Sequence, residues 1–120
     1  MDHTCLVVPV KPGKEEALRD FYREIESAKK DDYDRSEQRL GITKEVAWSA
    51  KADGGTLAVI YIESDNFDTA FSKFVQSQDE FDLWFKEQVL DLSGLDLNNP
   101  PEMELPALLS VYEAQVGAAR

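Results

Sequence analysis

Two unbroken apolar runs of strand length most restrict what this chain can fold into. The first spans Thr4–Val10 and the second Thr56–Ile62, and both contain many β-branched residues, which favour strands. Neither run alternates with polar residues, so each would be apolar on both faces of a sheet. The second run follows Ala52-Asp53-Gly54-Gly55, and Asp-Gly between two strand patterns predicts a hairpin. The two runs therefore predict the central strands of a sheet.

The elements between these runs follow from changes in the spacing of apolar residues. A helical spacing begins at Glu15, and its apolar stripe weakens toward Leu40, which predicts one long helix with a bend near Asp31-Asp32. The residues of this stripe are Leu18, Phe21, Tyr22, Ile25 and Ala28, continued more weakly by Tyr33, Ser36 and Leu40. Gly41 is a suitable residue to end the helix. Ile42–Ala50 then alternates between apolar and more polar residues, as expected for a strand at the edge of a sheet.

The second half of the chain predicts another helical region and a last strand. Phe67–Leu92 has helical spacing, either as two helices or as one helix broken at Ser77, where a capping-box pattern occurs. Leu95–Pro106 is an irregular loop with three prolines, and Ala107–Glu113 is the predicted last strand. The resulting order is strand, helix, strand, strand, helix, strand. It predicts an α+β domain with the ferredoxin-like βαββαβ order and a four-stranded antiparallel sheet.

In a ferredoxin-like fold the helices cover one face of the sheet only. Central strands that are apolar on both faces would leave a large hydrophobic patch on the other face of a solitary copy. Face-to-face pairing of two copies about a two-fold axis covers that patch. The length of 120 residues suits one domain. We therefore expect a single domain over residues 1–120 that forms a homodimer.

The composition excludes several classes of protein. The chain carries 13 basic and 24 acidic residues, a net charge of −11, and such a field repels nucleic acid and anionic membrane surfaces. No apolar stretch approaches the roughly 20 residues needed to span a bilayer. Cys5 is the single cysteine, so no disulfide can form within the chain. We expect a cytoplasmic protein without nucleic-acid or membrane partners.

Two short motifs resemble a known group of proteins. Val10–Glu16, with Phe21 after it, resembles the strand-to-helix entry of the dimeric α/β-barrel superfamily, and Ser77–Phe85 resembles its second-helix region. The nearest groups are antibiotic-biosynthesis-monooxygenase-like proteins and small uncharacterised bacterial members. The resemblance implies a dimeric α/β barrel with a substrate cleft between the sheet and the helices of each protomer. Haem-degrading members use a histidine on the second helix, whereas the one histidine here is His3, so we expect no haem or metal cofactor.

Residues that could line such a cleft come from several predicted elements. They are Glu45, Trp48, Ser49, Tyr61, Trp84 and Tyr112. A carboxylate near tyrosines in an apolar cleft has a raised pKa and can act as a general base on a phenolic or enolic substrate. In the alternative interpretation Glu45 and Ser49 face water on an edge strand, and the two tryptophans pack in the core. The sequence assigns no catalytic residue.

Two functions from different classes remain open at this point. One is a non-catalytic protein that binds a small apolar or aromatic molecule, and the other is a cofactor-independent monooxygenase or isomerase. A buried ionisable pair in the cleft distinguishes them, because only the enzyme requires one. Leu95–Pro106 is long for a connection in a compact domain. It could close over the cleft, extend across a dimer partner or cover an edge strand.

Overall fold

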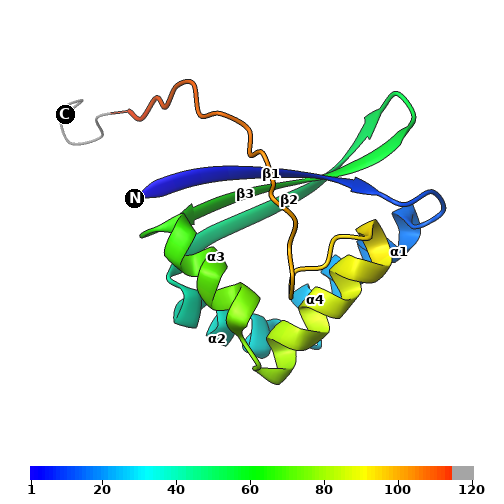
Figure 1. Cartoon of the computed structure of the whole chain (residues 1–120), viewed down its shortest axis with the longest axis horizontal. Helices are drawn as coiled ribbons and strands as arrows, with labels where there is room; N and C mark the ends of the chain where they lie inside the picture. The colour runs from blue at the N-terminus through cyan, green and yellow to red at the C-terminus, as the bar shows by residue number, and fades with distance from the viewer. Residues whose placement is uncertain (115–120) are drawn as a thin grey trace.

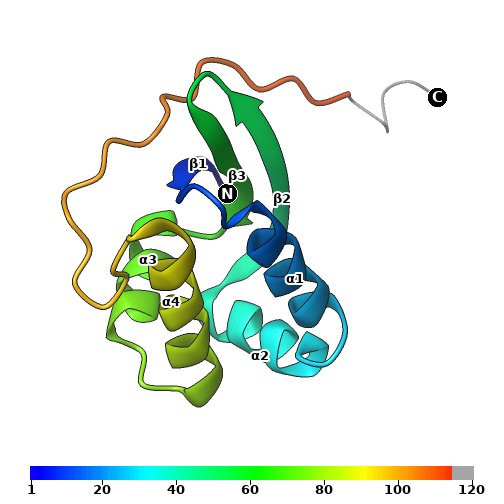
Figure 2. The same cartoon turned by 90° about the vertical axis from the view of Figure 1, so that its right-hand side faces the viewer.

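The computed structural model describes residues 1–114 of the chain. Their elements are, in order, β1 (Asp2–Val10), α1 (Glu15–Glu26), α2 (Lys30–Leu40), β2 (Ile42–Ala52), β3 (Gly55–Ser64), α3 (Phe67–Gln76) and α4 (Glu80–Ser93). The helices all lie on one side of the sheet (Figure 1). The view turned by 90° shows α1 and α2 under one part of the sheet and α3 and α4 under another (Figure 2). The architecture is therefore α+β with an antiparallel sheet, as predicted.

β3 is the middle strand of the sheet and pairs antiparallel with β1 on one side and β2 on the other. The predicted hairpin is confirmed, because Ala52 pairs with Gly55 across the turn at Gly54. Gly54 has a φ of +89°, a left-handed conformation that glycine adopts without strain. Alternate residues of β3, from Thr56 to Ser64, are buried against the helices. The long apolar run thus supplies one face to the core and a second face to the open side.

The first predicted helix is two helices. α1 ends at Glu26, and Lys29 donates its backbone N–H to the carbonyl of Glu24 before α2 begins. The break lies just before the acidic run where a bend was predicted. α1 buries Leu18, Phe21 and Ile25, three residues of the predicted apolar stripe. α2 ends at Gly41 with a φ of +78°, as the sequence indicated.

The second helical region is also two helices, the first of the two predicted alternatives. Asn66 caps α3 by accepting a hydrogen bond from the Thr69 N–H. Asp79 caps α4 by accepting from the N–H groups of Phe81 and Asp82, so the cap falls two residues after the Ser77 of the predicted capping box. None of the helices within residues 1–114 is long and apolar enough to cross a membrane.

The predicted fourth strand does not form. The described residues build a three-stranded sheet in the order β1-β3-β2, and Ala107–Glu113 lies outside any strand. β1, predicted to be central, is therefore an edge strand here, because no other segment among residues 1–114 pairs with its outer side. The chain instead passes β1 and projects away on the open-face side of the sheet (Figure 1).

The sheet face turned away from the helices is apolar. Val7, Val59 and Trp48 form one row across it, since Val7 and Trp48 are the register partners of Val59 on the two outer strands. Val7 is 44% exposed and Trp48 53% exposed. Neighbouring rows on the same face include Cys5, Tyr61 and Val46. Within one protomer, the described residues leave this open face largely uncovered.

Candidate functional site

A cavity of about 130 Å³ lies between the sheet and the helices. Apolar cavities of about 150 Å³ have room for one benzene-sized molecule. Its walls are mainly aliphatic and aromatic, and include Leu6 and Ile60 from the sheet and Phe71, Phe74, Phe81 and Phe85 from α3 and α4. The aromatic residues of both helices face inward because they follow the three-four spacing of one helix face. The cavity therefore suits a small, mostly apolar ring.

The loop after α4 contributes part of the cavity wall. Leu95, Leu97 and Met103 all line it, and Leu97 is buried. Among the positions proposed for Leu95–Pro106, its first part therefore covers the cleft. The apolar side chains of this loop exclude water from one side of the cavity.

Two carboxyl groups meet on the wall that α2 and β2 build. Glu37 of α2 and Glu45 of β2 both line the cavity, beside Tyr33 and Tyr22. A register irregularity between Ile42 and Lys44 allows Glu45 to line the cavity although its parity differs from that of Ile42. The polar side chain of Glu45, near the beginning of β2, therefore faces the helices.

Burial and like charge both act on this carboxyl pair. Burial raises the pKa of Glu45 well above its ordinary value, although hydrogen bonding from Glu37 and Tyr33 opposes the rise. Burial also raises the pKa of Glu37, and the neighbouring charge of Glu45 adds to that effect. Two carboxyl groups in such a position cannot both ionise readily. Burial and like charge therefore favour retention of a proton by the pair, and two carboxyl groups that share one proton can offer one acid and one base to the cavity.

The two tyrosines remain protonated beside the carboxyl pair. Burial raises the pKa of Tyr33 and of Tyr22, and the charge of Glu45 raises both further. A neutral tyrosine is a hydrogen-bond donor. Tyr33 and Tyr22 can therefore donate to an anionic oxygen in the cavity while the carboxyl pair moves protons.

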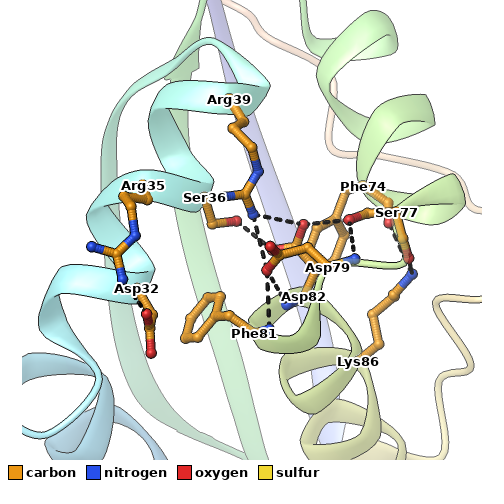
Figure 3. A network of polar contacts seen from close by, with 10 residues as sticks. All are labelled: Asp32, Arg35, Ser36, Arg39, Phe74, Ser77, Asp79, Phe81, Asp82 and Lys86. Atoms are coloured by element: carbon orange, nitrogen blue, oxygen red, sulfur yellow. Dashed lines mark hydrogen bonds and ion pairs between the residues drawn. The ribbon is translucent and has the colours of Figure 1, made fainter.

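A buried polar network fixes α2, which carries Glu37, to the start of α4 (Figure 3). Its centre is Asp82, which is 1% exposed. Ser36 and Ser77 donate their hydroxyl groups to the Asp82 carboxylate, and Arg39 donates to it at 3.2 Å. Arg39 also forms an ion pair with Asp79 at 3.1 Å. Because Ser36 precedes Glu37 in the chain, this network positions the Glu37 side of α2.

The residues predicted for the cleft lie in five different places. Glu45 lines the cavity, whereas Trp48 and Ser49 lie along a shallow groove beside α1. Tyr61 is on the open face, where it accepts a hydrogen bond from His3 and donates one to Glu63. Tyr112 is 88% exposed beyond the sheet. Of the predicted residues, Glu45 alone lines the cavity, and Trp84 lies outside its walls.

The sequence prediction missed Glu37, Tyr33 and Tyr22. Tyr33, Glu37 and Leu40 have the spacing of one helix face, and Tyr33 and Leu40 already belonged to the predicted apolar stripe. The sequence therefore did contain a signal for Glu37, namely a glutamate that lies between two apolar residues on one helix face. Among residues 1–114 no cluster of His, Cys, Asp and Glu is arranged to hold a metal ion.

We expect Trp84→Ala to lower the free energy of unfolding by about 3 kcal/mol. The Trp84 ring packs against Phe21 and Phe81 with centroid separations of 5.5 and 5.7 Å, and the Lys29 ammonium lies 4.6 Å from its centroid. Urea denaturation of wild type and variant measures the loss. A loss below roughly 1 kcal/mol would contradict a packing role. Its fluorescence should also respond little to a ligand in the cavity.

Comparison with known proteins supports the fold. No family model and no curated protein sequence shows significant similarity to this chain. Among solved structures, that of an L-rhamnose mutarotase from Formosa agariphila matches with a TM-score of 0.58 and 11% identity, over 95% of this chain and 100% of that one. At this identity the likeness concerns the fold alone, and it is compatible with a ferredoxin-like arrangement. It does not single out the antibiotic-biosynthesis-monooxygenase-like proteins as the nearest group.

Proposed function

We propose that the protein is a cofactor-independent isomerase that moves a proton on a small, mostly apolar ring compound. The observation that carries this proposal is the pair of Glu37 and Glu45 in the wall of an apolar cavity. A buried ionisable pair is the feature that separates an enzyme from a simple binding protein. The solved structure with a similar fold is described as a mutarotase, and that activity is also an isomerisation.

The carboxyl pair can carry out such a reaction without a metal or a redox cofactor. The ionised carboxylate removes a proton from a carbon next to a carbonyl group, while the neutral carboxylic acid donates its proton to the carbonyl oxygen. This step gives an enol. Return of a proton to a different carbon, with loss of the enol proton to the other carboxylate, gives the isomer and restores both groups. Tyr33 and Tyr22 would donate to the oxygen as negative charge develops there.

The cavity favours an apolar substrate over a sugar. A sugar needs a hydrogen-bond partner for most of its hydroxyl groups, because an unpaired buried hydroxyl group is unfavourable. Here the polar groups gather on the wall with Glu37 and Glu45, and the other walls are mainly aliphatic and aromatic. We therefore propose a ring with one carbonyl, enol or phenol group rather than a polyhydroxylated substrate.

The enzyme proposal predicts that Glu45→Gln lowers proton-transfer activity at least 100-fold, since glutamine can neither remove nor donate the proton. Cyclohex-3-en-1-one is a suitable probe, because its conversion to the conjugated isomer is followed by ultraviolet absorbance. Glu37→Gln should have a similar effect. Glu87→Gln, an exposed carboxylate on α4, is the matched control and should retain full activity.

The alternative function is binding of the same class of molecule without catalysis. The apolar walls of the cavity favour it as much as they favour an enzyme. Nuclear magnetic resonance titration with small cyclic ketones and phenols separates the two. Binding in the cavity without isomerisation or hydrogen exchange into solvent above the buffer rate would support the alternative. Absence of both binding and turnover across the panel would contradict both functions.

We also propose that the protein is a homodimer, a dimeric α/β barrel paired through the open face. The exposed row of Val7, Val59 and Trp48 supports this, because an apolar patch of this kind marks an interface. Light scattering should give about twice 13.6 kDa. Trp48→Asp should shift the mass to that of one chain by placing a charge in the interface. A wild-type monomer at micromolar concentration would exclude this pairing.

A further inference from the structure

The segment Ala107–Glu113, which we call the arm, is the most exposed apolar part of the described chain. Leu108 is 61% exposed, Leu109 is 93% exposed and Tyr112 is 88% exposed. Three large apolar side chains so close together in water are unfavourable, since each loses the free energy that burial would supply. In an isolated protomer these apolar side chains of the arm therefore remain exposed to water.

The arm lies on the side of the sheet that the helices leave open. Met103–Pro106 and Leu6–Pro9 line one shallow groove, so the chain passes the outer edge of β1 there. Beyond this point the arm continues above the open face toward the beginning of β1 (Figure 1). Near its far end, the Glu113 carboxylate oxygen lies 4.0 Å from the His3 ring at the beginning of β1. The arm thus lies on the side of the sheet where the sheet of a second, face-to-face copy would pack.

A second copy of this chain has sheet edges with which the arm can pair. β1 and β2 are the two edges of the described sheet, and their outward backbone N–H and C=O groups can pair with an added strand. The arm was predicted to be a strand from its own sequence. In a face-to-face pair each arm stands beside the sheet of the other copy, so one two-fold axis places both arms alike.

The charge of the chain also favours this occupant. Two copies with a net charge of −11 each repel one another, so segments with few charged residues are favoured for contacts between them. Glu113 is the one charged residue of the arm. The row of Val7, Val59 and Trp48 on the open face is likewise uncharged, whereas Glu63 and Lys44 lie in the row at the beginning of β1. The arm and the open face are therefore the surfaces through which two such acidic chains can meet.

We propose that the arms are exchanged: each arm docks as an added strand on a free sheet edge of a second copy. This proposal rests on the homodimer under "Proposed function" and adds the segment that holds it together. It also explains why the predicted fourth strand is missing from a single protomer. The partner's arm would complete a four-stranded sheet that this chain alone leaves with three strands.

Two arm variants test the exchange, with sedimentation and light scattering over a range of concentrations as the measurement. One is a chain that ends at Pro106, and the other is Leu109→Asp, which places a charge at a position that is almost fully exposed in one protomer. Both are expected to remain folded by circular dichroism and to weaken dimerisation at least 100-fold. Leu90→Asp, an exposed leucine on α4, is the matched control and should dimerise like wild type.

The outcomes separate the exchange from the other proposals. A wild-type dimer whose arm variants dimerise equally well would overturn the exchange and leave the open-face homodimer intact. An arm that folds back onto its own sheet would make the variants less stable without changing their mass, which also overturns the exchange. A wild-type monomer would overturn both. The isomerase activity of the Glu37 and Glu45 pair is measured independently of these masses.

Discussion

Lys86→Met is expected to lower the free energy of unfolding by about 3 kcal/mol, one of the largest losses for a single substitution in this chain. Lys86 is 1% exposed. Its ammonium donates to the carbonyl oxygens of Phe74, Val75 and Ser77 at 3.0, 3.1 and 3.0 Å. These carbonyls lie at the end of α3 and the turn after it, where a helix leaves carbonyls without partners of its own. Of the three, that of Phe74 also accepts the Ser77 N–H at 3.2 Å.

Methionine keeps most of the volume of lysine but supplies no donor. The carbonyls of Val75 and Ser77 would lose the ammonium from which they accept, and that of Phe74 would keep only the Ser77 N–H. An unsatisfied buried acceptor costs about 1–3 kcal/mol. Part of this loss is offset, because the substitution also removes a buried charge. Burial already lowers the pKa of Lys86, against the opposing charge of Asp82.

Urea denaturation at neutral pH measures the effect of Lys86→Met. Lys73→Met is the matched control, because Lys73 is an exposed lysine in the last turn of α3 and its substitution should change stability by less than about 0.5 kcal/mol. Equal stabilities of the two variants would show that the three carbonyls find other donors. Such a result would contradict a structural role for Lys86.

The regular elements could be predicted from the sequence because their signals are local. The apolar run Thr56–Ile62 became the middle strand, and Gly41 ends α2 in a left-handed conformation. Each of these features depends on neighbouring residues alone. The order of elements followed, and with it the coverage of one sheet face by helices.

The fourth strand was not predictable in the same way, because a strand forms only where an edge is available to it. Ala107–Glu113 has the composition of a strand but forms none in the described structure. Whether it pairs with its own β1 or with another chain depends on the path of the loop after α4. That loop packs Leu97 into the cavity and leads the chain across the edge of β1 to the open-face side.

The candidate site was half predictable for a related reason. Glu45 was a candidate because a carboxylate was expected near Tyr61 and Tyr112, whereas the tyrosines that line the cavity with it are Tyr22 and Tyr33. Glu37 lies in a helix with many charged residues, where a carboxylate is expected to face water. Only the packing of α2 beside β2 turns it into the cavity. Lys86 was missed for the same reason, since sequence patterns place lysine at the surface.

We expect the protein to lose about 2 kcal/mol of stability between pH 5.5 and pH 8.5 through the carboxyl pair. The folded pKa values of Glu37 and Glu45 are raised by burial, with the charge of Glu45 adding to the rise at Glu37. The folded state therefore binds more protons than the unfolded state above the ordinary glutamate pKa. The stabilisation is complete below that pKa and is lost as the pH rises through the folded values.

The figure of about 2 kcal/mol is smaller than full retention of one proton over this interval would give, roughly 4 kcal/mol, because both carboxyl groups are half-buried and solvent screens part of the effect. Glu37→Gln removes one member of the pair, so the stability of the variant should change less with pH. Urea midpoints at pH 5.5, 7.0 and 8.5 give the two slopes.

Glu87→Gln decides whether the pair is responsible for the slope. A chain with a net charge of −11 also becomes less stable as acidic groups ionise, through general repulsion. Glu87→Gln and Glu37→Gln make the same substitution, yet Glu87 is exposed on α4 and away from the pair. The Glu87 variant should therefore keep the wild-type slope while the Glu37 variant flattens it. Equal slopes in both variants would mean that Glu37 and Glu45 ionise like surface carboxylates and cannot hold the proton that the proposed isomerisation requires.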